Sequence, residues 1–132
     1  MFTSLNYSDK QIEKYYQAAA KDLSLASSTS APELAFYACF NVIIKVAMAV
    51  CAKNNLKVKS RTGHHTELIN KLAEYLNDEE ILIIASKIKS KRNRDLYDGG
   101  IETSEKEAAY YLEFCAKLMK QADTYLFPKR LL

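Results

Sequence analysis

Apolar side chains recur every three or four positions along most of this chain, which is the period of an amphipathic α-helix. The first such stretch follows a capping box of Ser8 and Gln11 and runs to a serine-rich turn at residues 27–30. Pro32 suits the first position of a second helix, because the N–H that proline lacks needs no partner there. This second helix continues to about Lys53 and is apolar nearly all round, so we expect it at the centre of the fold.

The second half of the chain predicts three more helices. Helical spacing runs from about His64 to Leu76, and Asn77 is expected to cap a fourth helix that continues to about Tyr97. A capping box at Ser104 opens a long fifth helix.

Residues 57–63 form a basic connection, which we expect to be a loop. No segment shows sustained alternation of apolar and polar residues, the period of a half-buried strand. We therefore expect an all-α fold, in which residues 1–132 form a single domain with its core at about 8–127. The predicted architecture is a bundle of about five helices, built on an up-and-down four-helix core.

The three cysteines, Cys39, Cys51 and Cys115, lie in apolar periodic stretches, are odd in number and lack the spacing of a metal site. We expect reduced core residues in a cytoplasmic protein. The longest apolar stretch, from Leu34 to Ala52, carries polar residues near its middle and is interpreted as a buried helix rather than a membrane span. The amino terminus carries no pattern typical of an export signal.

The net charge of +3 decides little about partners. Local charge is less even, because two stretches are basic and lack acidic residues: Lys53, Lys57, Lys59 and Arg61, and then Lys87, Lys89, Lys91, Arg92 and Arg94. If the fold joins these stretches, they form a surface that attracts phosphate.

Tyr37, Asn41 and Lys45 form a polar stripe on the otherwise apolar second helix. The stripe lines a cleft or an interface, or it is the solvent face of a partly exposed helix. His64 and His65 are adjacent and point to different faces of a helix, which makes them a poor metal pair. A structural or capping role is favoured for them, and we expect no metal and no cofactor.

The segment from Lys91 to Asp98 is the best candidate for chemistry. Arg92 and Arg94 can hold a phosphodiester through charge-assisted hydrogen bonds, with Asn93 as a neutral donor. The alternative is a solvated helix end, where late cations favour the helix dipole and Arg94 pairs with Asp98.

The pair Arg92-Asn93 near the end of a late helix resembles the signature of the HEPN superfamily, in which an arginine precedes a histidine by four to six intervening residues. The tyrosine-rich first helix, the segment 35–40 and the sequence Gly63-His64-His65 agree with that resemblance in their order along the chain. The resemblance covers roughly residues 8–127.

The resemblance implies a small helical bundle that forms a homodimer with a shared cleft and cleaves RNA without a metal. Many such domains are toxins paired with a nucleotidyltransferase antitoxin. Arg92 would then hold the scissile phosphate, Asn93 would orient it, and the histidine would assist attack by the ribose 2′-hydroxyl.

This chain departs from the signature at the histidine. Tyr97 stands at the four-residue spacing and Asp98 follows it, as in a HEPN subgroup with an aromatic residue near that place. Tyrosine, with an ordinary pKa of about 10, is a poor general base at neutral pH. Asp98 is a candidate substitute, and His64 or His65 is a candidate to enter the cleft from the third helix.

Two functions therefore stand as hypotheses. The first is a HEPN-type domain whose basic cleft binds RNA or a nucleotide, with catalysis assigned to Arg92, Asn93, Tyr97 and Asp98. Substrate binding is then assigned to a second set of residues: Arg94, Lys91, Lys45, Asn41 and Tyr37. It would act as a metal-independent ribonuclease of a toxin-antitoxin or defence system, although the missing histidine leaves enzymatic activity open. The alternative is a noncatalytic HEPN module that dimerises or docks a nucleotidyltransferase.

Overall fold

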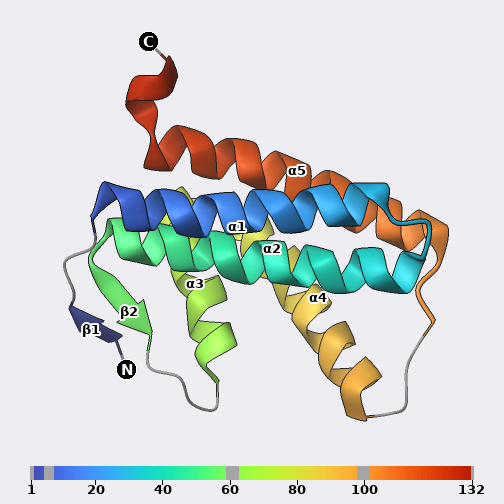
Figure 1. Cartoon of the computed structure of the whole chain (residues 1–132). Helices are drawn as coiled ribbons and strands as arrows, with labels where there is room; N and C mark the ends of the chain where they lie inside the picture. Colours follow the sequence, from blue (N-terminus) through green and yellow to red (C-terminus); the bar gives the residue numbers. More distant parts are fainter. Residues whose placement is uncertain (1, 5–7, 59–62, 98–101, 132) are drawn as a thin grey trace.

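Helices α1 (Asp9–Ser28) and α2 (Pro32–Lys53) form an antiparallel hairpin (Figure 1). The predicted capping box is present at the start of α1. The helix ends where the hydroxyls of Ser27 and Ser28 donate hydrogen bonds back to backbone carbonyls of the last turns. Pro32 then opens α2 without needing an N–H partner, so both helices confirm the pattern of the sequence.

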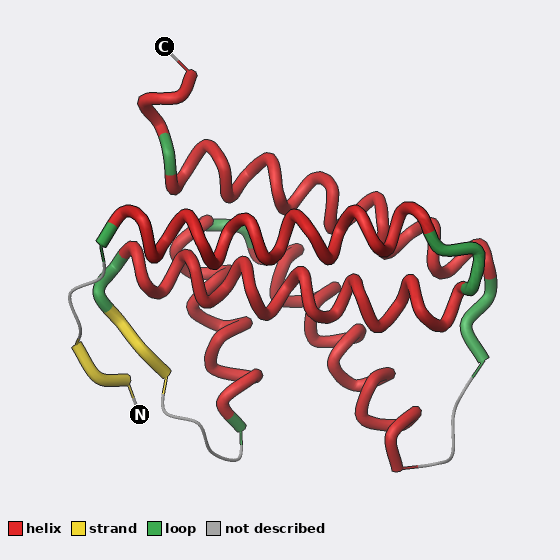
Figure 2. The backbone as a smooth tube through the Cα atoms, in the orientation of Figure 1, coloured by secondary structure: helices red, strands yellow, loops and turns green. Residues whose placement is uncertain are grey.

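The computed structural model describes residues 2–4, 8–58, 63–97 and 102–131. These residues form five α-helices, two three-residue strands and a closing 3-10 turn, which confirms the predicted all-α bundle. The helices after α2 are α3 (His64–Leu76), α4 (Glu79–Tyr97) and α5 (Glu105–Leu126). In Figure 2 the chain of α5 runs along the α1–α2 hairpin, while α3 and α4 descend at a steep angle to it.

Helix α2 is central, as its composition predicts, because it contacts each of the other four described helices. Its length and hydropathy would suffice for a membrane span, yet most of its most apolar window is buried inside the bundle, as in the core helix of a folded domain. The largest fully buried side chains come from α2 and from the helices that cover it: Phe36, Val42, Ile43, Val46, Val50, Ile69, Leu72, Ile81, Ile88 and Leu118.

The structure corrects the predicted N-cap of α4, at the junction of α3 and α4. Asn77 was expected to cap α4, but it adopts a left-handed conformation with φ 51° and is the C-cap of α3. The cap of α4 is Asp78, whose Oδ1 accepts a 3.0 Å hydrogen bond from the N–H of Glu80. Asparagine tolerates positive φ better than most residues, so it suits the end of a helix as well as a start.

The predicted basic loop at residues 57–63 is also corrected at its start. Strand β2 (Leu56–Val58) pairs antiparallel with β1 (Phe2–Ser4), with Phe2 opposite Val58. A strand of three residues is too short to show an alternation of apolar and polar side chains, and its pairing partner is distant in sequence. The hydrophobic pattern therefore does not predict this strand.

The three cysteines are buried and free, as expected. Burial raises the pKa of the Cys51 thiol to about 11. Cys115 lies against α2, where its Sγ donates to the carbonyl of Cys39 at 3.5 Å. Cys51 is therefore a protonated packing residue at neutral pH.

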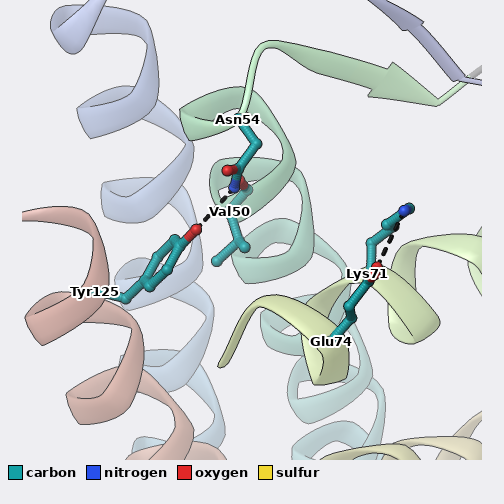
Figure 3. A network of polar contacts seen from close by, with 5 residues as sticks. All are labelled: Val50, Asn54, Lys71, Glu74 and Tyr125. Atoms are coloured by element: carbon teal, nitrogen blue, oxygen red, sulfur yellow. Dashed lines mark hydrogen bonds and ion pairs between the residues drawn. The ribbon is translucent and has the colours of Figure 1, made fainter. Parts of the chain in front are cut away.

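Figure 3 shows how the end of α2 is tied to α5. The side-chain amide of Asn54 donates to the carbonyl of Val50 and to the hydroxyl of Tyr125, each at 2.9 Å. The same view shows the ion pair of Lys71 and Glu74 on α3, whose atoms approach to 3.0 Å. A surface pair of this kind contributes little to stability.

Tyr125→Phe removes the hydroxyl that accepts from Asn54 and keeps the ring. We expect the free energy of unfolding to fall by about 1 kcal/mol, the usual net contribution of one hydrogen bond. Urea denaturation measures this change. Tyr110→Phe is the matched control, because Tyr110 is 54% exposed, and its loss should be near zero. Equal losses in the two variants would contradict a specific role for the Asn54 contact.

Candidate functional site

Two consecutive cations of α4 lie over two rings of α2 that are one helical turn apart. The Nζ of Lys91 is 5.3 Å from the centroid of Phe36, and the Cζ of Arg92 is 5.0 Å from the centroid of Phe40. Both rings are buried. The carboxyl half of α4 is therefore attached to the central helix by cation–π contacts, which contribute about 0.5–2 kcal/mol each.

A histidine of α3 also packs against the ring of Phe40. His65 packs edge-on against Phe40 with a centroid distance of 5.4 Å, and His64 lies 4.1 Å from His65. Gly63 precedes them at φ 86°, a conformation that glycine adopts without strain. We call Arg92, Phe40, His65 and His64 the Arg92 site. This site joins α2, α3 and α4. The guanidinium of Arg92 and the imidazole of His65 both contact the ring of Phe40.

The electrostatics of the Arg92 site favour an anion. Burial, which is the largest cause, and the electrostatic effect of His64, Arg92 and Lys89 together lower the pKa of His65 from 6.5 to about 4. His65 is therefore a neutral imidazole at pH 7. Among the described side chains, no carboxylate lies within ion-pair distance of Arg92. A guanidinium over an aromatic ring still has five N–H donors in a planar fork, which can bind a phosphate.

The lowered pKa predicts how stability depends on pH. Because the folded-state pKa of His65 is about 4 and the ordinary value is 6.5, the unfolded chain takes up the proton first as the pH falls. Stability is fully present above pH 6.5 and is lost between about pH 6.5 and 4. His65 is partly exposed, and with solvent screening we expect a loss of roughly 1–2 kcal/mol.

Denaturation at several pH values measures this loss. In His65→Gln the part of the pH dependence between about 6.5 and 4 should shrink. An unchanged profile in that variant would show that another group titrates.

Arg94 is separated from Arg92. Residues two positions apart on an α-helix point about 200° away from each other around the helix axis, so the two guanidinium groups leave α4 on different flanks. Arg94 is exposed and lines a groove shared with α5, together with the buried Lys91. The two arginines, which the sequence suggested as one phosphate clamp, therefore belong to different surfaces.

The three residues of the polar stripe on α2, Tyr37, Asn41 and Lys45, also have different surroundings. The Nζ of Lys45 lies 2.5 Å from Oδ2 of Asp22, a buried carboxylate of α1, so this lysine joins the two helices. Tyr37 is 40% exposed and contacts the edge of Phe36, and Asn41 is exposed. The solvent-face interpretation fits Asn41, and an ion pair accounts for Lys45.

The remaining predicted catalytic residues stand near the end of α4. Asn93 is partly buried beside Arg92. Tyr97 is the last residue of α4, and its side chain lies outside the described part, as does the whole of Asp98. Among the described residues, no three His, Cys, Asp or Glu side chains gather in a way that could hold a metal ion.

Phe40 was not singled out in the sequence as a site residue, and His65 was favoured for a capping role. The sequence places Phe40 on the inner face of α2, but periodicity does not say which helix covers that face. The adjacency of His65 to Arg92 depends on how α3 and α4 dock, and no local signal predicts it.

No family model, curated protein or solved structure matches this chain.

Proposed function

We propose that this chain is a HEPN-type domain whose Arg92 site binds a phosphate of single-stranded RNA and promotes cleavage of the chain without a metal. The observation that supports this most is the contact of the Arg92 guanidinium and the His65 imidazole with one ring, that of Phe40. A fixed cation and a neutral imidazole are groups that can accelerate phosphodiester transesterification, the first by stabilising charge and the second as a general base.

Each group has a defined task in this reaction. The edge N–H donors of Arg92 hold two phosphate oxygens and stabilise the charge that grows on them as phosphorus becomes five-coordinate. The imidazole of His65 accepts the proton of the ribose 2′-hydroxyl. The bond between the 2′-oxygen and phosphorus forms as the bond to the 5′-oxygen breaks, and the departing oxygen takes a proton from water. The products are a 2′,3′-cyclic phosphate and a 5′-hydroxyl.

The HEPN signature carries a histidine on the fourth helix that this chain lacks. In this proposal His65, on α3, takes its place. The phosphate's negative charge would raise the pKa of His65 from about 4 and make it a better base in the complex than in the free protein.

Incubation of a mixed RNA pool with purified protein and a metal chelator tests the proposal. We expect cleavage by the wild type that leaves cyclic phosphate ends, and none by Arg92→Ala. Tyr97→Phe reports any contribution of the phenol. No cleavage above the Arg92→Ala background by folded wild type would contradict catalysis and leave a binding function.

A noncatalytic docking module is the second candidate, and exposed apolar side chains near the α1–α2 turn favour it. Leu25 is 55% exposed and Leu34 is 61% exposed, and Tyr37 follows one turn later on α2. Co-purification with the product of an adjacent reading frame that encodes a nucleotidyltransferase would support this role. Leu34→Asp should then abolish the complex and leave the fold intact.

A further inference from the structure

A groove of about 630 Å³ lies between α4 and α5, on the flank of α4 that carries Arg94. One wall is cationic, with Lys87, Lys91 and Arg94 from α4. The other carries Glu102 and Glu107 together with the phenol of Tyr111. None of these residues belongs to the Arg92 site.

Lys91 on the α4 wall of this groove is a buried cation that has no counterion among the residues that the structure describes. The residue is 5% exposed, and its Nζ donates to the carbonyl of Glu102 at 3.4 Å while it lies over the ring of Phe36. Within the described part of the chain, no carboxylate approaches it within ion-pair distance. Burial of an ammonium is unfavourable unless an opposite charge compensates it, and an anion bound from solution in the groove would supply that charge.

The opposite wall offers two carboxylates, which accept hydrogen bonds, and a phenol, which can donate or accept one. Glu107 is held by the capping box of α5, in which its Oε1 accepts from the N–H of Ser104 at 3.3 Å. Tyr111 lies near both signs of charge: burial and Glu107 raise the pKa of its phenol, and Arg94 opposes them. The groove therefore presents cations and carboxylates on facing sides.

We propose that this groove binds a small phosphorylated molecule with free hydroxyl groups, such as a nucleoside monophosphate or a sugar phosphate. The phosphate compensates Lys91 and is held by Arg94 and Lys87, and the hydroxyls donate to Glu102 and Glu107. The volume falls in the range of small-ligand sites, which is about 300–1,000 Å³. A nucleic-acid strand fits less well, because further phosphates would meet the two carboxylates. The inference does not depend on the proposed RNA chemistry of the Arg92 site.

Calorimetric titration of the full chain with AMP, ribose 5-phosphate and adenosine tests this proposal. We expect the first two to bind with one site per chain and adenosine, which lacks the phosphate, not to bind. Arg94→Gln should weaken AMP binding at least about tenfold, the effect of one charge-assisted contact. Lys91→Met, which keeps an apolar stem over Phe36, should do the same.

Arg92→Ala is the control, and AMP binding should be unchanged in it. Absence of AMP and ribose 5-phosphate binding to wild type up to about 10 mM would overturn the proposal. So would AMP binding that survives Arg94→Gln and Lys91→Met, or that is lost in Arg92→Ala alone. Loss of RNA binding in Arg92→Ala with intact AMP binding would support both sites, since the two functions fail separately.

Discussion

Arg92→Ala is expected to weaken binding of single-stranded RNA about 10- to 100-fold, because a hydrogen bond to a charged group contributes roughly 1.5–3 kcal/mol. The same change removes the cation over Phe40 and should lower the free energy of unfolding by about 1 kcal/mol. Fluorescence anisotropy with a labelled oligonucleotide measures the affinity. Arg92→Lys keeps the charge but loses the planar fork, so its affinity should be intermediate.

Arg94→Ala is the matched control for this prediction. It removes the same charge from the same helix, two residues away, but from the flank that faces the groove with α5. RNA binding should change less than about threefold, the effect of a screened surface charge. Equal losses in the Arg92 and Arg94 variants would indicate a diffuse basic surface and contradict a site built on Phe40.

His65→Gln is expected to lower the rate of RNA cleavage by about 10² to 10⁴, the usual contribution of a general acid or base. Binding should change little, because a neutral imidazole adds no charge to hold the phosphate. Single-turnover kinetics separates the two effects. In the wild type the rate should rise with pH through the pKa of His65 in the complex, as the imidazole loses its proton.

His64→Gln provides the comparison for His65. The two rings are 4.1 Å apart, and His65 packs against Phe40, the ring that Arg92 also covers. A rate loss below about tenfold is expected for His64→Gln. If the two variants lose activity equally, the histidines act as a structural pair and the assignment of a base to His65 is wrong.

The sequence predicts the helices well because their ends are marked by local chemistry. Ser8 and Ser104 accept from the N–H groups three residues later, and Pro32 stands at the first position of α2. These signals act within one turn of helix, so they need no knowledge of the tertiary fold. Asn77 is the exception, since asparagine suits either end of a helix and only the docking of α3 and α4 decides between them.

The candidate site is much less visible in the sequence, because the contacts of Arg92 and His65 with Phe40 cross between helices. Lys45 looked like a cleft residue, but its partner Asp22 lies on α1. Arg92 and Arg94 looked like one clamp by proximity along the chain, and the helical turn separates them. His65 looked like a capping residue, and the packing of α3 against α2 brings it to the ring that Arg92 covers. Periodicity identifies buried faces but not the faces that meet.

The pKa of His65 in the presence of RNA tests the central claim most directly, and NMR titration of the imidazole measures it. An oligonucleotide with 2′-O-methyl groups binds without being cleaved, so the complex is stable during the titration. The free protein should titrate near 4, and a phosphate held by Arg92 should raise the pKa of His65 by at least about one unit. An unchanged pKa of His65 at saturating oligonucleotide would show that RNA does not occupy the Arg92 site.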